Sequence, residues 1–339
     1  MFIPSKIYYE KNIIHYELGK KLIEQYKALN VPFEEIESHN RIESLQKNPN
    51  SEFVNMKNLL IIGTRKTHKY VPNYKVSDFL VPYTSSGCSA MCLYCYLVCN
   101  YNKCSYMRLF VNREQMMDKL LRTAFKAETD LTFEIGSNSD LVLENTITGN
   151  LPWTIEVFAH SKKGYITFPT KFDMVDDLLN LDHKGKTIVR VSVNPSDIIK
   201  SIELKTSPLE RRILAINKLK DAGYPVGILI APVIMVDNWK ALYAELIEQL
   251  YDNLSDKVKA DVIFEVIFMT YSYVHNAINQ EAFPKEKYPN MPMLYDNQIM
   301  TGRGRGKYMY RQNLRDEGEE FLRDLLKQYF PNNTVLYVV

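Results

Sequence analysis

Residues 84–99 read T-S-S-G-C-S-A-M-C-L-Y-C-Y-L-V-C, and we expect the fold to be arranged around them. Cys88, Cys92 and Cys95 stand in a C-x3-C-x2-C pattern, so that three thiolates share one short loop. Closely spaced thiolates are the usual ligands of iron–sulfur clusters. Three of them fill three corners of a cubane and leave its remaining iron open to a small molecule.

Two other interpretations of the cysteines stay open, namely a zinc site and reduced structural thiols. Zinc usually takes four ligands that come from two paired arms of the chain. All five cysteines lie between residues 88 and 104, and the six histidines show no H-x3-5-H spacing. The pattern therefore favours a cluster over zinc.

Length and composition limit the class of protein. The chain has 339 residues, of which 46% are hydrophobic, which is enough for one large or two small domains. It has no apolar run of about 18 residues, so we expect no contact with a membrane. The first residues lack a signal pattern and the cysteines are clustered, which predicts a cytoplasmic protein. The formal net charge is only +2, so any nucleic-acid surface must be a local patch.

Apolar strands alternate with amphipathic helices along most of the chain. Strands are predicted at 58–65, 131–135, 165–171, 187–194, 224–234 and 260–269, and helices at 17–29, 113–128, 152–162, 174–183, 207–223 and 238–254. In the helix at 207–223, we expect Ser207 to be the cap and Pro208 the first helical residue. Near-continuous apolar strands are typical of a parallel sheet covered by helices. Right-handed crossovers would curl this sheet into a full or partial TIM-type barrel.

Polar residues gather where the predicted strands end. In a TIM-type barrel the chemistry lies at the carboxyl ends of the strands, because the following loops converge there. The candidates at these positions are Ser137, Ser139, Asp140, Lys171, Ser192, Asn194 and the pair Ala231-Pro232. Each residue alone is well explained as a turn or cap residue. Their shared position predicts a site. The basic stretch at 65–70 is a weaker candidate for phosphate contact, since such runs are usually solvated.

The C-terminal section has a different character. Residues 296–311 read D-N-Q-I-M-T-G-R-G-R-G-K-Y-M-Y-R, in which glycines alternate with cations. Glycine allows a close backbone approach and cations neutralise phosphates. We therefore predict a hairpin that contacts nucleic acid through Arg303, Arg305, Lys307 and Tyr308, with an ordinary flexible hairpin as the alternative. A helix at 313–329 and a strand at 335–339 are expected to follow.

The segment S-G-C-S-A-M-C-L-Y-C-Y-L resembles the spore photoproduct lyase family of radical S-adenosylmethionine (SAM) enzymes. The similarity extends over nearly the whole chain, through F-E-x-x-S-N-S-D, T-K-F-D-M-V-D-D-L-L-N, H-K-G-K-T-I-V-R-V-S-V-N and G-K-Y-M-Y-R. This resemblance implies an α/β fold, a partial (β/α)6 barrel of the radical SAM type at 76–285. It also implies an N-terminal extension at 1–75 and a DNA-contacting hairpin, helix and strand at 286–339.

The resemblance implies DNA repair by a carbon–carbon lyase. A [4Fe-4S] cluster on Cys88, Cys92 and Cys95 would bind SAM, and the SAM-derived 5′-deoxyadenosyl radical would revert the thymine dimer spore photoproduct (5-thyminyl-5,6-dihydrothymine) to two thymines during spore germination. The implied partners are double-stranded DNA carrying an extruded lesion and a reductant such as flavodoxin or ferredoxin, in the spore core. The alternatives are a diverged paralogue with another nucleic-acid or peptide substrate, and a non-catalytic DNA-binding homologue.

Individual residues match positions of the family. Ser139 and Asp140 match the region around the SAM ribose. Lys171 and Ser192 match residues that hold the methionine carboxylate, Ala231 lies near the cofactor, and Tyr94 and Tyr96 match tyrosines implicated in radical propagation. A lysine and a hydroxyl at strand ends are chemically suited to a carboxylate, because they form charge-assisted hydrogen bonds with it.

The chain departs from the family at the hydrogen donor. The family has a cysteine where this sequence has Ser137, and a serine O–H bond is too strong to replace a thiol as hydrogen-atom donor. Either the donor has moved or the chemistry has changed. Cys99 and Cys104 are the spare thiols, as a moved donor or as ordinary loop thiols. In the hairpin, Gly302-Arg303 replaces the family's Arg-Tyr, so the aromatic wedge is either absent or moved to Tyr308.

Overall fold

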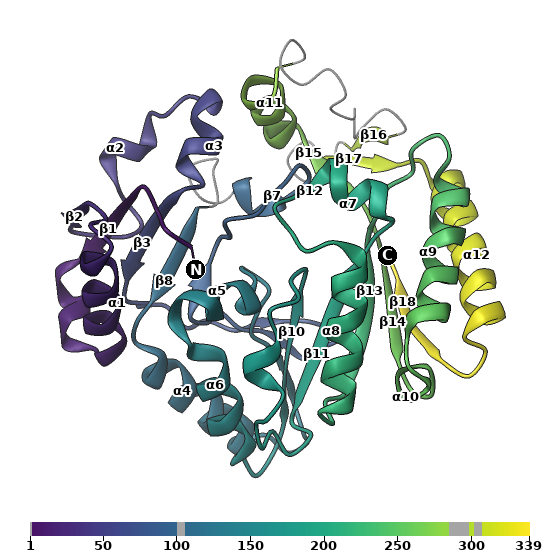
Figure 1. Ribbon diagram of the computed structural model, residues 1–339, viewed down its shortest axis with the longest axis horizontal. Coiled ribbons are helices and arrows are strands. Elements are labelled where there is room, and N and C mark those ends of the chain that lie inside the picture. The colour runs from purple at the N-terminus through teal and green to yellow at the C-terminus, as the bar shows by residue number, and fades with distance from the viewer. Residues whose placement is uncertain (1, 100–105, 285–297, 302–306) are drawn as a thin grey trace. The chain divides into compact units, whose positions relative to one another are not determined.

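The computed structural model describes residues 2–99, 106–284, 298–301 and 307–339 (Figure 1). The chain forms two compact units. Unit 1 consists of Met1–Met91, Leu97–Phe168 and Leu181–Thr187, and unit 2 consists of Cys92–Tyr96, Pro169–Asn180 and Ile188–Val339. The division expected from the sequence, at 1–75, 76–285 and 286–339, stays a prediction.

Unit 1 contains a five-stranded sheet with the order β2-β1-β3-β8-β6. Its strands are β1 (Lys6–Glu10), β2 (Phe33–Ile36), β3 (Leu59–Gly63), β6 (Ser85–Ser86) and β8 (Met107–Phe110). All its pairings are parallel except that between β6 and β8. The central strand β3 is the apolar run predicted at 58–65, and its residues Leu60, Ile61 and Ile62 have no exposed surface. The segment before the cysteine loop therefore supplies the central strand of this sheet.

Some helices of unit 1 were predicted from the sequence and others were not. They are α1 (Glu17–Ala28), α2 (Glu43–Gln46), α3 (Phe53–Met56), α4 (Arg113–Lys126), α5 (Leu141–Thr148) and α6 (Asn150–Ala159), with the 3-10 turns η1 (Lys11–His15) and η2 (Asn50–Glu52). The helices predicted at 17–29 and 113–128 are α1 and α4, whose apolar faces are buried. α5 was not predicted, because its buried sequence L-V-L-E-N-T-I-T shows no clear polar face.

The largest sheet has eight strands in the order β18-β14-β13-β11-β10-β9-β5-β4. They are β4 (Val71–Pro72), β5 (Phe79–Leu80), β9 (Thr132–Glu134), β10 (Tyr165–Thr170), β11 (Thr187–Val193), β13 (Val226–Val233), β14 (Ile263–Phe268) and β18 (Thr334–Val338). The pairings β5–β9, β9–β10, β11–β13, β13–β14 and β14–β18 are parallel, and β4–β5 is antiparallel. This mixed α/β fold with a half-barrel sheet confirms the predicted fold class.

Unit 2 adds helices and short strands. Its further elements are β12 (Glu203–Leu204), β15 (Thr270–Ser272), β16 (Gln298–Thr301), β17 (Lys307–Tyr310), the 3-10 turn η4 (Asp176–Leu178), α7 (Ser196–Ile202), α8 (Leu209–Asp221), α9 (Trp239–Asn253), α10 (Asp256–Lys259), α11 (Tyr273–Ala282) and α12 (Gln312–Tyr329). Four elements have residues in both units, namely β7 (Met91–Cys92), the 3-10 turn η3 (Tyr96–Cys99), β10 and β11. α9 and α12 lie side by side (Figure 1), where the Trp239 and Phe321 rings meet edge to face with centroids 5.2 Å apart.

The C-terminal hairpin is present in unit 2. β16 pairs antiparallel with β17, from Gln298 opposite Tyr310 to Thr301 opposite Lys307. β17 also pairs antiparallel with β15, which places Tyr308 opposite Tyr271. The hairpin thus forms a small three-stranded sheet. Its predicted tip, with Arg303 and Arg305, lies outside the described residues.

The helix predicted at 174–183 is wrong. The segment contains only the short turn η4. Tertiary contacts hold it in another conformation, because the Asp173 carboxylate accepts hydrogen bonds from Ser207 and Arg211, and the Leu178 carbonyl accepts one from the buried Tyr224 hydroxyl. Such contacts override a weak helix propensity.

The predicted cap of α8 is also wrong. Pro208 is the N-cap residue itself and provides no side-chain bond. The Ser207 hydroxyl lies away from this role, since it bonds to Asp173. The short helix α7, just after β11, was not predicted. Among the described residues, no helix is long and apolar enough to cross a membrane.

Candidate active site

The first cysteine of the loop lies in unit 1. The Cys88 sulfur accepts a hydrogen bond from the backbone amide of Ala90 at 3.3 Å. The backbone carbonyl of Cys88 accepts one from the buried Lys57 ammonium at 2.6 Å. The residue before it, Gly87, forms an isolated parallel bridge with Ser139. An amide directed at the sulfur stabilises a thiolate, so this part of the loop is suited to a metal-bound cysteine.

The segment Cys92–Tyr96 belongs to unit 2 and is held by its backbone. The Leu93 amide donates to the Ile202 carbonyl at 3.0 Å, and the Leu93 carbonyl accepts from the Asn279 amide group at 2.9 Å. The Cys95 carbonyl lies 3.0 Å from His275 Nδ1, which must therefore carry a proton. Because His275 and Asn279 are one turn apart on α11, a single helix face fixes this part of the loop.

Of the three cysteines in the pattern, Cys88 lies in unit 1, and Cys92 and Cys95 lie in unit 2. None of them forms a disulfide. Among the described residues, no three His, Cys, Asp or Glu side chains gather as one bound ion needs. In a cubane each cysteine binds a different iron, so its thiolates stand farther apart than the ligands of one ion. The loop's sulfur chemistry and its backbone fixation both suit such a group.

The predicted ribose region lies in unit 1 beside a buried carboxylate. Ser85 Oγ is 2.7 Å from Ser139 Oγ and 2.6 Å from Glu144 Oε2. Burial raises the pKa of Glu144, although hydrogen bonds from neighbours including Ser85 and Asn150 act in the opposite direction. Asp140 caps α5, because its Oδ1 accepts the amides of Val142 and Leu143 at 3.1 Å. The strand-end position thus also begins a helix.

Three of the predicted cofactor-binding residues meet in unit 2. Lys171 follows β10, Ser192 lies near the end of β11, and Ala231 lies near the end of β13. The Lys171 ammonium donates to Ser192 Oγ at 2.5 Å and to the Ala231 carbonyl at 2.7 Å. The Ser192 hydroxyl is in turn 2.8 Å from the same carbonyl. The ends of separate strands therefore bring these groups together.

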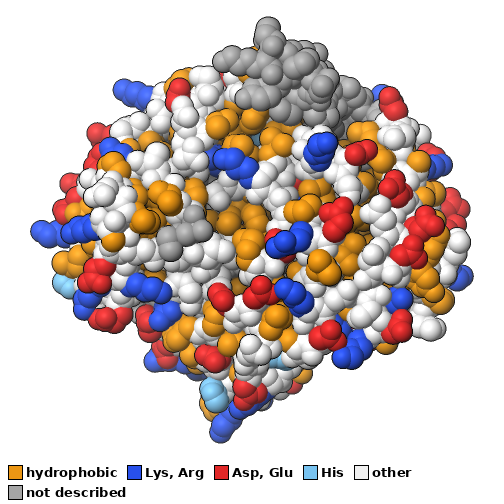
Figure 2. Space-filling view, viewed as in Figure 1, with side chains coloured by type: hydrophobic (Ala, Val, Ile, Leu, Met, Phe, Trp, Pro, Cys, Tyr) orange, Lys and Arg blue, Asp and Glu red, His pale blue; other side chains and the backbone are white. Residues whose placement is uncertain are grey.

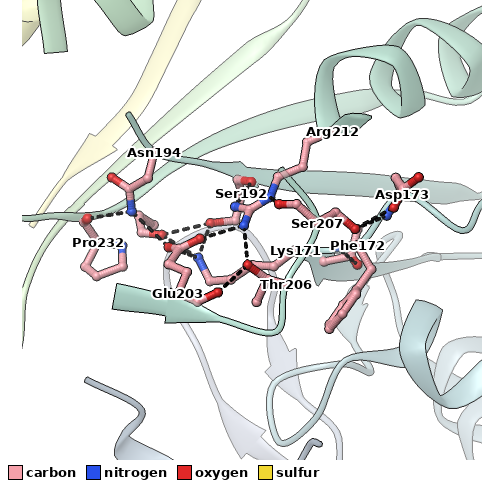
Figure 3. A network of polar contacts seen from close by, with 12 residues as sticks. Lys171, Phe172, Asp173, Ser192, Asn194, Glu203, Thr206, Ser207, Arg212 and Pro232 are labelled. Carbon is pink, nitrogen blue, oxygen red and sulfur yellow. Dashed lines mark hydrogen bonds and ion pairs between the residues drawn. The ribbon is translucent and has the colours of Figure 1, made fainter. Parts of the chain in front are cut away.

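A buried carboxylate, Glu203, connects this group to its surroundings (Figure 3). Its Oε1 accepts hydrogen bonds from Tyr94 at 2.5 Å, Lys171 at 2.9 Å and the Asn194 amide at 2.9 Å. Its Oε2 lies 2.7 Å from a guanidinium nitrogen of Arg212. Neither the Glu203 nor the Arg212 side chain is exposed. Such a buried charge is tolerated only because it is paired and hydrogen-bonded.

Arg212 is fixed from several sides. Its guanidinium donates to the carbonyls of Ser207 and Ser192 at 2.7 and 2.9 Å and to the Thr206 hydroxyl at 2.7 Å. Asn194 is fixed as firmly, since its amide also donates to the Pro232 carbonyl at 3.0 Å, and its oxygen accepts from Tyr243 at 2.9 Å. These bonds fix Arg212 and Asn194, which hold Glu203 together with Lys171 and Tyr94.

The charges of the network set the protonation states of its members. Burial on its own raises the pKa of the Glu203 carboxyl, but the cations Lys171 and Arg212 and the hydrogen bonds from Tyr94 and Asn194 lower that pKa to about 2. Burial, followed by the charge of Glu203, raises the pKa of Tyr94 well above its ordinary value. Glu203 is therefore ionised and Tyr94 is a neutral phenol at physiological pH.

The two predicted tyrosines have different surroundings. The Tyr94 hydroxyl is held by Glu203, whereas 59% of Tyr96 is exposed. Ser137 is half-buried in the turn between β9 and α5. Cys99 ends η3, and Cys104 lies outside the described residues. Tyr94 is therefore a predicted catalytic residue whose hydroxyl has a defined hydrogen-bond partner, Glu203.

Of the four predicted nucleic-acid residues, the structure describes two. Lys307 is exposed and Tyr308 is half-buried on β17, while Arg303 and Arg305 lie outside the described residues. On the face in Figure 2, the described Lys and Arg side chains are interspersed with Asp and Glu. In the basic stretch, Arg65 packs within unit 1, with its guanidinium 3.9 Å from the Phe110 ring centre and its Nε donating to the Tyr83 carbonyl. Arg65 thus has a structural role.

Sequence reasoning missed Glu203, Arg212, His275 and Asn279. Glu203 lies between two predicted elements and Arg212 lies inside the helix predicted at 207–223, and only the tertiary structure shows that both are buried. For His275 and Asn279, their i, i+4 spacing in a half-apolar helix was an available but weak signal. These four residues act on the predicted site through hydrogen bonds and ion pairs.

The fold finds counterparts among solved structures. A cysteine-to-serine variant of spore photoproduct lyase matches with a TM-score of 0.91 and 29% identity, over 100% of this chain and 99% of that one. A further variant of spore photoproduct lyase, with bound AdoMet and dinucleoside spore photoproduct, matches with a TM-score of 0.90 and 28% identity, over 100% and 99%. The arrangement of helices and strands is thus that of these lyases.

Sequence comparison gives the same class. The family model described as "Spore photoproduct lyase" matches residues 2–339. Spore photoproduct lyase of Bacillus subtilis (strain 168) is 32% identical over 342 residues, covering 99% of this chain and 98% of the relative. That of Geobacillus sp. (strain Y412MC61) is 30% identical, covering 99% and 98%. The chain belongs to the spore photoproduct lyase family, as its cysteine loop and strand-end motifs predicted.

Proposed function

We propose that this protein is a radical SAM lyase that reverts spore photoproduct in DNA to two thymines. The observation that carries the proposal is the family match over residues 2–339, which includes the cysteine pattern at 88–95. A relative solved with AdoMet and dinucleoside spore photoproduct supports the same substrate and cofactor. The gathered Lys171, Ser192 and Ala231 support a carboxylate-bearing ligand.

Cys88, Cys92 and Cys95 would hold a [4Fe-4S] cluster. When bound, the cluster and SAM supply a carbon-centred radical that starts the repair. The chain itself orients these groups, as proteins do for cofactors that carry difficult chemistry. Lys57 holds the backbone of Cys88 in unit 1 through a hydrogen bond to its carbonyl. In the same way, His275 holds the backbone of Cys95 in unit 2.

Lys171 would bind the methionine carboxylate of SAM. It is cationic, lies at a strand end and is 21% exposed in its side chain. The Ser192 hydroxyl would support this contact, and Asn194 would keep the strand end in place through its bonds to Glu203 and Tyr243. Ser139 and Asp140 would line the ribose.

Hydrogen return to the product thymine is the step in which this chain departs from its family. Ser137 stands where the family's donor cysteine is expected, and a serine hydroxyl does not release a hydrogen atom as a thiol does. We propose Cys99 or Cys104 as the donor. Tyr94 and Tyr96 would relay the hydrogen atom. The Tyr94 hydroxyl, which is hydrogen-bonded to Glu203, is neutral and therefore retains the hydrogen atom that a relay needs.

DNA would be bound through the hairpin, with Lys307 and Tyr308 joined by Arg303 and Arg305. Cations neutralise phosphates and aromatic rings stack on bases. The partner is proposed to be double-stranded DNA with one extruded lesion, and the reductant a flavodoxin or ferredoxin. A cytoplasmic location in the spore core agrees with this substrate.

Ser137 also favours a second candidate function. A family member with altered hydrogen transfer is expected if the chain is a diverged radical SAM paralogue that acts on another nucleic-acid or peptide substrate. A third alternative is a non-catalytic DNA-binding homologue. It would lack the cluster's absorbance at about 400 nm after anaerobic reconstitution with iron and sulfide.

The deciding experiment is anaerobic turnover of dinucleoside spore photoproduct. The reconstituted protein is incubated with this substrate, SAM and dithionite, and the products are separated by chromatography and mass spectrometry. Formation of the dinucleoside with two intact thymines supports the lyase. SAM cleavage without consumption of the lesion would favour the paralogue, and loss of both activities despite a stable fold would favour the non-catalytic homologue.

A further inference from the structure

Every N–H donor of Lys171 has a partner within the protein. The ammonium contacts Ser192 Oγ at 2.5 Å, the Ala231 carbonyl at 2.7 Å and Glu203 Oε1 at 2.9 Å. A lysine ammonium has three donors and no more. A carboxylate ligand can therefore bind Lys171 only by displacing one of these partners.

Glu203 is the charged partner of Lys171 and keeps a partner on each oxygen when Lys171 leaves it (Figure 3). Its Oε1 keeps the hydrogen bonds from Tyr94 and Asn194, and its Oε2 keeps the ion pair with Arg212. Ser192 and Ala231 are instead fixed by their strands and bonded to each other at 2.8 Å. The Lys171–Glu203 contact is also the longest of the three.

The balance of charge favours the same exchange. Lys171 and Arg212 carry two positive charges, and Glu203 carries the one negative charge that pairs with both. A second carboxylate would leave one anion for each cation. Only Lys171 is accessible to it, since its side chain is 21% exposed and that of Arg212 is fully buried. Paired buried charges are far less costly than an excess of one sign.

We propose that Glu203 is a positioning residue that occupies Lys171 in the unliganded protein and is exchanged for the carboxylate of SAM. This inference rests on the proposed function. After the exchange, Glu203 Oε1 is left with Tyr94 and Asn194, so its hydrogen bond to the Tyr94 hydroxyl becomes stronger. Binding of SAM is thereby coupled to the strength of the Tyr94–Glu203 hydrogen bond, because Lys171 and Tyr94 both donate to the same oxygen, Glu203 Oε1.

The coupling predicts opposite effects for two substitutions. Glu203→Gln weakens the competitor for Lys171, so the Kd of SAM is expected to fall by about three- to tenfold. Tyr94→Phe removes a hydrogen-bond donor from Glu203 Oε1. The negative charge of Glu203 then attracts Lys171 more strongly, so Glu203 competes better with the SAM carboxylate. The Kd of SAM is then expected to rise by about two- to fivefold. A residue with only a structural role would weaken binding in both variants.

The measurement is equilibrium dialysis of SAM against the anaerobically reconstituted wild-type protein and the two variants. 5′-Methylthioadenosine, which lacks the amino-acid carboxylate, is the matched control ligand, and its Kd is expected to be unchanged. Thermal unfolding of each variant checks that the fold is retained.

The exchange is overturned if SAM binds the wild type but Glu203→Gln leaves its Kd unchanged or raised. It is also overturned if 5′-methylthioadenosine changes in parallel with SAM. Should Glu203→Gln fail to fold, Tyr94→Phe decides alone, and a Kd that is unchanged or lowered contradicts the exchange. If the reconstituted wild type binds no SAM, the proposed function fails first and the exchange fails with it.

Discussion

A buried ion pair beneath the strand ends of unit 2 gives a sharp test of what holds the site in place. Arg190 on β11 donates to both carboxylate oxygens of Glu265 on β14, at 3.0 and 3.3 Å. The two side chains are 4% and 1% exposed. Tyr337 on β18 also donates to this carboxylate. Gly227 lies opposite Arg190 in the register and leaves space, since a Cβ there would be 3.2 Å from Arg190 Cγ.

The single substitution Glu265→Leu removes one partner and leaves the Arg190 charge buried without its carboxylate. Breaking a buried pair in this way costs about 3–5 kcal/mol. The double variant Arg190→Met/Glu265→Leu removes both charges, and its cost is expected to be under about 1 kcal/mol because buried pairs contribute little beyond a packed apolar pair.

The assay uses the two tryptophans, which lie in different units. Trp153 is in α6 of unit 1 and Trp239 is in α9 of unit 2, so a Trp153→Phe background makes urea unfolding report on unit 2. With a slope of about 2–3 kcal/mol per M urea, the single variant is expected to unfold about 1–2 M earlier. The reasoning is refuted if the single variant loses under about 1 kcal/mol, or if the double variant is as unstable as the single one.

Other predictions follow from individual contacts. Burial alone raises the pKa of Glu10, but hydrogen bonds from His39 and Thr64 lower it from 4.5 to about 2, so protonation favours the unfolded chain. Urea unfolding in a Trp239→Phe background measures this effect. Between pH 6 and pH 2, the free energy of unfolding should fall by up to roughly 3 kcal/mol more with Glu10 present than in the Glu10→Gln variant. An equal fall in both proteins would contradict this. Ser137→Cys should leave the yield of intact thymines unchanged, because Cys99 or Cys104 is proposed to donate the hydrogen atom already, and a higher yield with fewer diverted products by mass spectrometry would contradict that proposal. Gly318→Ala should cost about 1–3 kcal/mol in thermal unfolding, because a Cβ there would lie 2.8 Å from Phe268 Cε1 and 2.1 Å from Met235 Cε, and a stability equal to wild type would show that both side chains move at no cost.

The parts of the fold that repeat a strong local pattern were predictable from the sequence. β13 and β14 are apolar runs, and α4 and α9 bury residues at helical spacing. Such periods follow from the geometry of strands and helices. The boundaries fell within a few residues of those predicted.

Elements fixed by distant contacts were not predictable. The segment at 174–183 has a helix-like pattern, yet Asp173 and Leu178 bond to residues more than thirty positions away. Glu203 looks like an exposed acid in the sequence, but it is buried because Arg212 and Lys171 converge on it. Long-range pairing of charges leaves no local period in a sequence.

The cysteine loop was found because its spacing is itself the chemical signal. The residues that hold the loop, His275 and Asn279, lie some 180 positions further along the chain and contact the loop through its backbone carbonyls. A backbone carbonyl has the same chemistry in every residue, so such contacts leave no trace in the sequence of the loop.

The most direct test of the proposed function is SAM cleavage by the anaerobically reconstituted protein in dithionite. Iron analysis is expected to give about four irons per chain, and chromatography is expected to show methionine and 5′-deoxyadenosine in equal amounts. Cys92→Ala is the matched control and should lose both the iron and the products. A reconstituted wild-type protein that binds zinc in place of iron, or that binds iron but leaves SAM intact under reductant, would contradict the proposal.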